Sequence, residues 1–138
     1  MNKPALILLT AATLAAATVF AQGQTTADGV GTDAQVKRGS DVYAMGCAAC
    51  HDAQLAGSGT APALAGTDFA ANWKDETVGA LFERIRATMP ADNPGSLKRD
   101  QTADLVAFIL NFNKYPLAQK DLPTEFEALK AIKITAPK

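Results

Sequence analysis

Residues 45–55 read MGCAACHDAQL and contain the pattern that decides the fold, Cys47, Cys50 and His51 in the order Cys-Ala-Ala-Cys-His. The segment holds both cysteines of the 138-residue chain and its only histidine. A disulfide between these cysteines would close a very small loop and stabilise the chain little, because the entropic gain grows with loop length. Two thiols and one imidazole within five positions therefore indicate a site that binds a single group.

Three interpretations of this pattern compete. A structural zinc ion needs four ligands, usually from two separated clusters, and the sequence offers only one. A thioredoxin-like redox pair needs a strand before the motif and a helix after it, and the chain shows no sustained strand alternation. Covalent attachment of haem c uses Cys-x-x-Cys-His, with two thioethers from the thiols and iron ligation by the adjacent imidazole. The sequence favours haem, with zinc and a redox pair as the alternatives.

The second axial ligand of the iron must come from elsewhere in the chain. A second histidine is absent from the sequence, and one of the three methionines is Met1. Met45 lies two residues before Cys47 and would be held on the same side of the haem as His51. Met89 is followed by Pro90, which ends the preceding helix and stiffens the loop. We therefore expect Met89 to bind iron; the alternative is a core methionine at a helix end.

The N-terminal 21 residues predict export. Residues 5–20 form an uncharged apolar run, and Val-Phe-Ala at residues 19–21 places small residues at the positions that a signal peptidase reads, with cleavage expected after Ala21. The alternative is a retained membrane anchor, but the run is short and nearly half alanine. Removal of residues 1–21 would leave a net charge of −2, so no basic surface points to nucleic acid or to a membrane.

The remaining chain predicts an all-α domain over residues 33–138. Residues 22–32 are polar and glycine-rich, which indicates a flexible lead-in. The expected helices span residues 33 to about 45, 75–88 and 99–112, with a short last helix from about Pro123. Residues 53–65 look like a loop.

Two residues are expected to mark helix ends, Asp33 as an N-terminal cap and Asn113 as a left-handed stop before Pro116.

On these residues the chain resembles class I c-type cytochromes. The resemblance rests on CAACH, on APALAG at residues 61–66, on IRATMPADNPGSL at 85–97 and on DLVAFIL at 104–110. The Met-Pro loop is most similar to the small periplasmic cytochromes that serve quinoprotein dehydrogenases. The resemblance implies the cytochrome c fold, with helices wrapped around one covalently attached haem.

The resemblance also implies residue roles. Cys47 and Cys50 would form the thioethers, and His51 and Met89 would be the axial ligands. Pro62 would accept the histidine Nδ1–H through its carbonyl; the alternative is an ordinary loop proline.

Three further positions match the family. Trp73 would lie beside the haem propionates, or else serve as a core anchor. Gly39 and Tyr43 would cross the last major helix near Phe108. Lys98 departs from the family pattern, since a Ser or Thr cap is expected there, and this leaves the start of that helix open.

These features predict a monomeric periplasmic electron carrier of bacterial origin that is not an enzyme. It would take electrons from a dehydrogenase, with a quinoprotein alcohol dehydrogenase as the specific candidate, and pass them to an oxidase or another cytochrome. Partners would dock on small or uncharged residues near the haem edge: Ala48, Ala49, Leu55, Ala56, Ala61, Pro90 and Ala91. One alternative is an enzyme that exposes iron by releasing Met89. Another is a dedicated subunit of a quinoprotein dehydrogenase complex.

Overall fold

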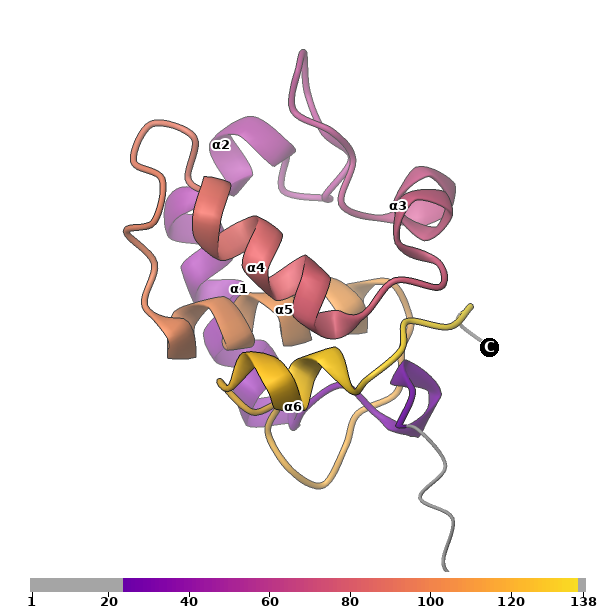
Figure 1. The fold of residues 1–138 in the computed structure, drawn as a ribbon. Helices are drawn as coiled ribbons and strands as arrows, with labels where there is room; N and C mark the ends of the chain where they lie inside the picture. Colours follow the sequence, from indigo (N-terminus) through magenta and orange to yellow (C-terminus); the bar gives the residue numbers. More distant parts are fainter. Residues whose placement is uncertain (1–23, 137–138) are drawn as a thin grey trace, which may run out of the picture.

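The computed structural model describes residues 24–136, so the predicted signal peptide and its cleavage site lie outside the described residues. Over that range the chain forms helices and isolated bridges but no strand, which confirms the predicted all-α class (Figure 1). None of the helices within it has the length and apolar character needed to cross a membrane.

The core is built on two helices that cross, α1 (Asp33–Gly46) and α5 (Arg99–Phe112). They pack more extensively than any other pair of described helices. Gly39 makes the crossing possible, because a Cβ at this position would collide with the Asp104 carbonyl and lie 2.8 Å from the Phe108 Cβ. The Tyr43 ring packs against Phe108 with centroids 5.3 Å apart. The helix crossing that the resemblance implied is therefore present.

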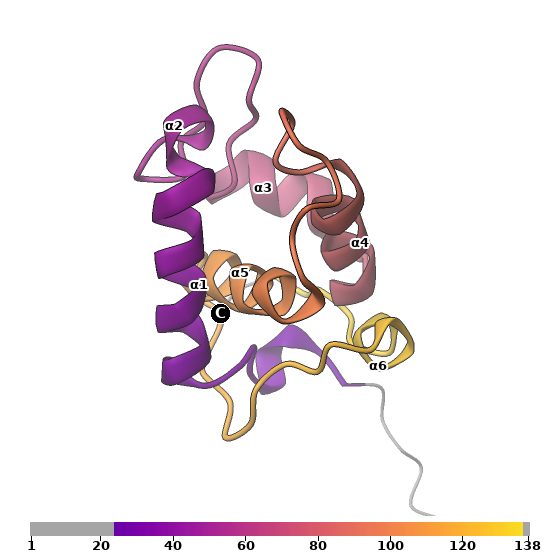
Figure 2. The same cartoon turned by 90° about the vertical axis from the view of Figure 1, so that its left-hand side faces the viewer.

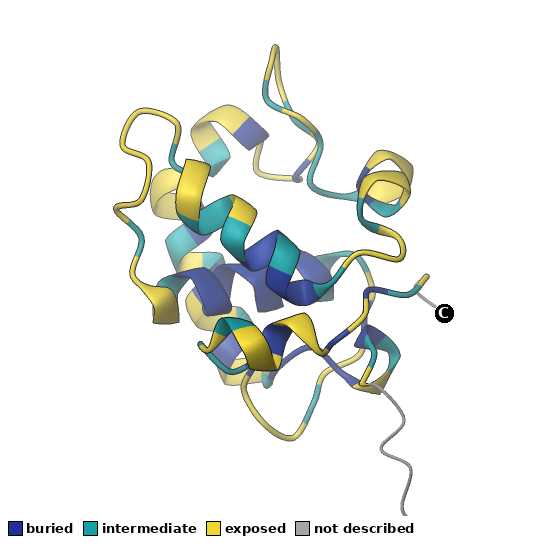
Figure 3. Ribbon diagram, viewed as in Figure 1, coloured by how far each residue is buried: buried dark blue, intermediate teal, exposed yellow. Residues whose placement is uncertain are grey.

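Three further helices complete the frame around α5. The helix α4 (Val78–Thr88) packs against both α5 and α6 (Phe126–Lys130), while α3 (Gly66–Trp73) precedes α4 in the chain. Figure 2 shows α1 and α2 (Ala48–His51) on one side and α4 on the other, with α5 between their lower parts. Buried residues concentrate on α5 and on the parts of α1 and α4 that face it (Figure 3).

The C-terminal segment joins distant parts of the chain. Lys133 forms isolated bridges with Thr25 and Thr77, and Ile134 exchanges backbone hydrogen bonds with residues 75 and 76. The hydroxyl of Tyr115 donates to the Thr135 carbonyl at 2.6 Å. Residues 24–26, 75–78 and 132–135 are thus held together at one end of the molecule.

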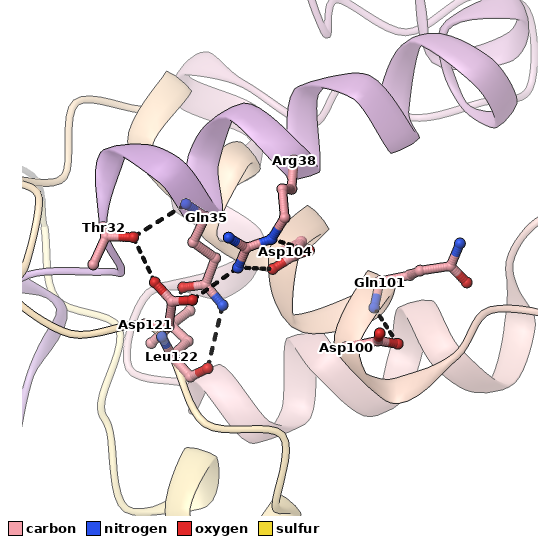
Figure 4. Close-up of polar contacts among 8 residues, drawn as sticks. All are labelled: Thr32, Gln35, Arg38, Asp100, Gln101, Asp104, Asp121 and Leu122. Atoms are coloured by element: carbon pink, nitrogen blue, oxygen red, sulfur yellow. Dashed lines mark hydrogen bonds and ion pairs between the residues drawn. The ribbon is translucent and has the colours of Figure 1, made fainter.

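A polar cluster fastens the loop after α5 to the two main helices (Figure 4). Arg38 donates to both carboxylate oxygens of Asp104 at 3.0 Å and to Asp121 at 2.8 Å. Asp104 and Asp121 raise the pKa of Arg38 by accepting these bonds. Beside it, the buried amide of Gln35 exchanges two hydrogen bonds with the backbone of Leu122. Long-range polar contacts therefore fix a loop that contains no helix until residue 126.

The segment before α1 differs from its prediction. Residues 24–32 are not a flexible lead-in within the described range, since Thr26 and Val30 are fully buried. A single 3₁₀ turn, η1 (Thr26–Asp28), lies here. The glycines of this segment serve close packing, because a Cβ at Gly29 would lie 2.8 Å from Ala118.

Several predicted helix ends also need correction. Thr32, not Asp33, caps α1, because its hydroxyl accepts the Gln35 N–H at 3.1 Å. Asn113 is not left-handed; the residue with positive φ is Lys114. Two helices begin later than predicted. The helix α4 begins at Val78 instead of residue 75, and α6 begins at Phe126 instead of about residue 123.

The helix expected over residues 99–112 has the predicted bounds. Its start needs no Ser or Thr cap at Lys98, because the Gln101 side chain accepts the Lys98 backbone N–H at 3.0 Å.

Candidate functional site

The Cys-Ala-Ala-Cys-His pattern forms a single helical turn at the end of α1. Cys47 closes α1 through its N–H to the Tyr43 carbonyl, at 2.9 Å, and its own carbonyl accepts the N–H groups of Cys50 and His51. Side chains three and four positions apart share one face of a helix, so both thiols and the imidazole lie on the same side of this turn. Cys47 is half-buried and Cys50 exposed, and neither forms a disulfide. Burial raises the pKa of the Cys47 thiol.

The imidazole of His51 is held in one tautomer. Its Nδ1 lies 2.9 Å from the carbonyl oxygen of Pro62, and the ring is buried. A carbonyl oxygen only accepts, so Nδ1 carries the proton and the lone pair lies on Nε2. This is the arrangement in which a histidine binds a metal through Nε2 while its other nitrogen is oriented by a backbone oxygen.

The residue after His51 has an unusual backbone. Asp52 adopts φ 68 and ψ 150, a region that is almost exclusive to glycine and costs a non-glycine residue about 1–3 kcal/mol. The hydroxyl of Tyr43 donates to the Asp52 carbonyl at 2.7 Å, and the Asp52 carboxylate accepts the Gln54 N–H at the same distance. Burial raises the pKa of Tyr43 to about 12, so this hydroxyl stays a donor at neutral pH. The turn that leaves the motif is therefore held by α1.

The loop that carries Pro62 is tied to the end of α5. The Asn113 amide nitrogen donates to the carbonyls of Leu64 and Ile109 at 2.9 and 2.8 Å, and its oxygen accepts the Gly66 N–H at 3.0 Å. Residues 53–65 contain no helix, as predicted. Leu55 within this loop is fully buried, which corrects its predicted place on an exposed docking surface. The other predicted docking residues are exposed or half-buried: Ala48, Ala49, Ala56, Ala61, Pro90 and Ala91.

Met89 lies at the end of α4, where its N–H closes the helix on the Ile85 carbonyl at 2.9 Å. The residue is half-buried, whereas Met45 is 79% exposed. Figures 1 and 2 both place α2 and the loop after α4 at the same end of the molecule, and Figure 2 shows them on opposite sides of it. The structure thus brings the segment of Met89 to the end that carries His51.

Trp73 is the last residue of α3, a helix that was not predicted. Its ring is half-buried and lies 6.4 Å from the buried Phe69 ring, centroid to centroid. Ala65 precedes this helix and has no side chain that could cap it, so no start signal for the helix is present in the sequence. The indole–phenyl contact fits a core anchor, and the predicted place of Trp73 beside the haem propionates stays a prediction.

The chemistry of residues 47–51 fits a covalently attached haem. Two unpaired thiols three positions apart lie on the face of the turn that also carries an imidazole with its lone pair on Nε2. Within residues 24–136 no group of three or more His, Cys, Asp or Glu side chains is arranged to hold a metal ion.

Comparisons with known proteins agree with this assignment. Residues 34–109 match the family described as cytochrome C oxidase, cbb3-type, subunit III. A chain in the crystal structure of the sulfane dehydrogenase SoxCD from Paracoccus pantotrophus is similar over 71% of this chain, with 25% sequence identity and a TM-score of 0.52. The match covers 52% of that chain, so this protein spans about half the length of its structural neighbour. No protein with a curated description matches the chain.

The family match covers more than half of the sequence and includes α1 from its second residue, the Cys-Ala-Ala-Cys-His turn, α4 and most of α5. The Cys47–Cys50 spacing within it is the one that covalent haem attachment requires. The chain therefore belongs to the family of cbb3-type cytochrome c oxidase subunit III, as a class I c-type cytochrome domain with covalently bound haem c.

Proposed function

We propose that the protein carries single electrons, with Cys47 and Cys50 as the thioether residues and with His51 and Met89 as the axial ligands. The observation that carries this proposal is the 2.9 Å contact between His51 Nδ1 and the Pro62 carbonyl, which leaves Nε2 as the ligating nitrogen. Met89 is half-buried and ends α4, and the loop after α4 lies at the same end of the molecule as α2 (Figure 2), whereas Met45 is 79% exposed.

The bound haem supplies an iron that alternates between the ferric and ferrous states. His51 and Met89 would occupy both axial positions, so this chain offers no open position for a substrate. A neutral thioether ligand in apolar surroundings stabilises the ferrous state and raises the reduction potential. These roles suit electron transfer rather than bond-making catalysis, and cytochrome c domains are electron carriers.

The donor in this proposal is a periplasmic dehydrogenase, with a quinoprotein enzyme as the specific candidate, and the acceptor is an oxidase or another cytochrome. The similarity to a chain of a sulfane dehydrogenase supports a dehydrogenase as a partner class. The apolar leader at residues 1–21 supports export to the periplasm. Trp73 would contribute an indole N–H beside the propionates.

A second candidate is a dedicated subunit of a dehydrogenase complex rather than a free carrier. The same structural neighbour favours it, because that chain is part of a dehydrogenase structure. Purification from the native host separates the two candidates. A subunit would elute with a dehydrogenase at constant ratio through two columns, whereas a free carrier would elute as a monomer.

The central experiment is reduction of the purified haem-loaded protein by candidate periplasmic dehydrogenases in a stopped-flow instrument. We expect one-electron reduction that is reversible in a potentiometric titration, and no binding of carbon monoxide by the ferrous form. Rapid carbon monoxide binding by the wild-type protein, or a haem that no dehydrogenase or chemical donor reduces, would contradict an electron carrier with two protein ligands.

A further inference from the structure

The turn after His51 has a backbone conformation that is unfavourable for the residue it contains, Asp52. Asp52 has φ 68 and ψ 150, a conformation that L-residues rarely adopt, and it directly follows the imidazole-bearing residue. Such a conformation persists only where surrounding contacts determine it. The contacts at this position therefore control the direction in which the chain leaves His51.

One of these contacts comes from a different helix. The Tyr43 hydroxyl, on α1, reaches the Asp52 carbonyl at 2.7 Å. The same carbonyl accepts the Leu55 N–H at 3.1 Å, and the His51 carbonyl accepts the Gly57 N–H at 2.9 Å. Tyr43 is itself fixed, because its ring is 3% exposed and packs on Phe108.

We propose that Tyr43 is a positioning residue for the axial histidine: its hydroxyl fixes the Asp52 carbonyl and so sets the orientation of the His51 imidazole. The proposal rests on the proposed function, since it concerns His51 as a ligand. It adds a third support to the two already described, the Cys47 carbonyl at the amide of His51 and the Pro62 carbonyl at its ring.

The chain contains its own matched control. It has two tyrosines, Tyr43 and Tyr115, and each is 3% exposed. The hydroxyl of Tyr115 also donates to a backbone carbonyl, that of Thr135, at 2.6 Å. This second contact lies at the C-terminal segment, which is tied to residues 24–26 rather than to the His51 turn. Tyr43→Phe and Tyr115→Phe therefore remove the same chemical group from equal burial.

The experiment compares both variants with the haem-loaded wild type. In Tyr43→Phe we expect a shifted reduction potential, displaced hyperfine-shifted methyl signals in the proton spectrum of the oxidised protein, and roughly tenfold faster hydrogen exchange at the Leu55 amide. In Tyr115→Phe the potential and the methyl signals should stay at wild-type values, and faster exchange should appear at the Thr135 amide instead.

Two further variants separate the hydrogen bond from packing and strain. Phe108→Leu alters the ring contact but keeps the hydroxyl, so it should move the methyl signals less than Tyr43→Phe. Asp52→Gly removes the strain, because glycine adopts φ 68 freely. The shift in reduction potential that Tyr43→Phe causes should therefore differ in size between the Asp52→Gly background and the wild-type background. Tyr115→Phe should leave the reduction potential unchanged in both backgrounds.

Equal potentials and methyl signals in Tyr43→Phe and wild type would overturn the proposal, as would a shift of the same size in Tyr115→Phe. Failure of the proposed function looks different, because the wild-type protein itself would then lack a haem spectrum or fail to be reduced. Should Tyr43→Phe not accumulate, the wild type still decides. A Tyr43 hydroxyl proton in the reduced protein that exchanges too fast to be observed at neutral pH would contradict the 2.7 Å bond.

Discussion

Gly39 in α1 lies directly against the main chain of Asp104 in α5. A Cβ on residue 39 would collide with the Asp104 carbonyl group, and backbone on a central helix cannot move aside as a flexible side chain can. The two longest described helices therefore approach each other at a distance that only glycine permits. Tyr43, one turn further along α1, then reaches both Phe108 and the turn after His51.

The first prediction follows from this contact. Gly39→Ala should lower the free energy of unfolding by about 1–3 kcal/mol, because overpacking would push α1 from α5. Gly46→Ala is the matched control, since a Cβ there would meet nothing within 4 Å apart from its chain neighbours and the backbone of its own helix. It should leave stability unchanged or raise it by up to about 1 kcal/mol, because alanine favours helix over glycine. Denaturation in guanidinium chloride gives the free energy of unfolding of both variants. Equal values for Gly39→Ala and Gly46→Ala would argue against the close crossing of α1 and α5.

The second prediction concerns haem attachment. Cys47→Ala or Cys50→Ala should prevent the double thioether linkage and leave little stably folded protein, because the haem completes a small apolar core. Intact mass spectrometry of the wild type should give the chain plus one haem. A wild-type protein with apo mass and a cooperative unfolding transition would contradict covalent attachment.

The third prediction tests the methionine ligand. Met89→Ala should keep the haem covalently bound but lower the reduction potential and allow carbon monoxide to bind the ferrous form, because the thioether ligand is lost. Met45→Ala is the control, and its wild-type spectrum is expected because Met45 is 79% exposed. A Met89→Ala variant with the potential and ligand reactivity of the wild type would identify a different sixth ligand.

The fourth prediction is a pH dependence at the polar cluster. The Thr32 hydroxyl and then Arg38 hold the pKa of Asp121 below its ordinary value of 3.8. A carboxylate with a lowered folded-state pKa adds stability above its unfolded value and loses that contribution as the pH falls through its folded value. Asp121→Asn should therefore reduce stability near neutral pH and converge with wild type below about pH 3.8.

The difference at neutral pH should be below about 1 kcal/mol, because the Asp121 side chain is 45% exposed. Asp92→Asn, in the exposed loop after α4, supplies a reference for loss of one surface charge. Urea titrations of the three proteins at stepped pH give the comparison. If the difference in stability between Asp121→Asn and wild type persists in acid, the ionised carboxylate is not the cause of that difference.

The fifth prediction addresses partner docking. Ala49→Lys or Ala91→Glu should slow electron transfer from the physiological donor, because each replaces an exposed, uncharged alanine with a charged residue at the end that carries His51. Ala128→Lys, at an exposed position of α6, should not slow this transfer. Spectrum and potential should stay nearly constant in all three. Stopped-flow rates at two ionic strengths measure the effect, and wild-type rates in Ala49→Lys and Ala91→Glu would place docking elsewhere.

The sequence predicted best what its local pattern determines. The span of α5 follows from apolar residues at helical spacing and from Pro116 beyond its end. Haem c was predicted from Cys47, Cys50 and His51, which lie within one helical turn. By contrast, α3 could not be predicted, because it has eight residues, one buried side chain and no capping side chain at Ala65.

Long-range contacts account for the other differences. Gly29 and Gly31 suggested flexibility, but both have positive φ and lie against Ala118 and Gln35. Composition cannot distinguish a mobile glycine from one that permits close packing. Asn113 was expected to stop a helix, whereas its amide instead joins three backbone groups of two segments that are distant in sequence. The roles of Pro62 and Trp73 at the haem, and those of the four proposed haem-binding residues, stay predictions.

The pairing of residues 132–135 with residues 24–26 also sets an order of events during synthesis. The hydrogen bonds from Thr26 to Lys133 and from Thr135 to Thr26 join positions more than 100 residues apart. They form only after nearly the whole chain has emerged, whereas the Cys47–His51 turn depends on hydrogen bonds within its own neighbourhood. We therefore expect both thiols to be accessible while the two ends of the chain are still apart. The haem would then be attached before these ends pair and the fold is complete.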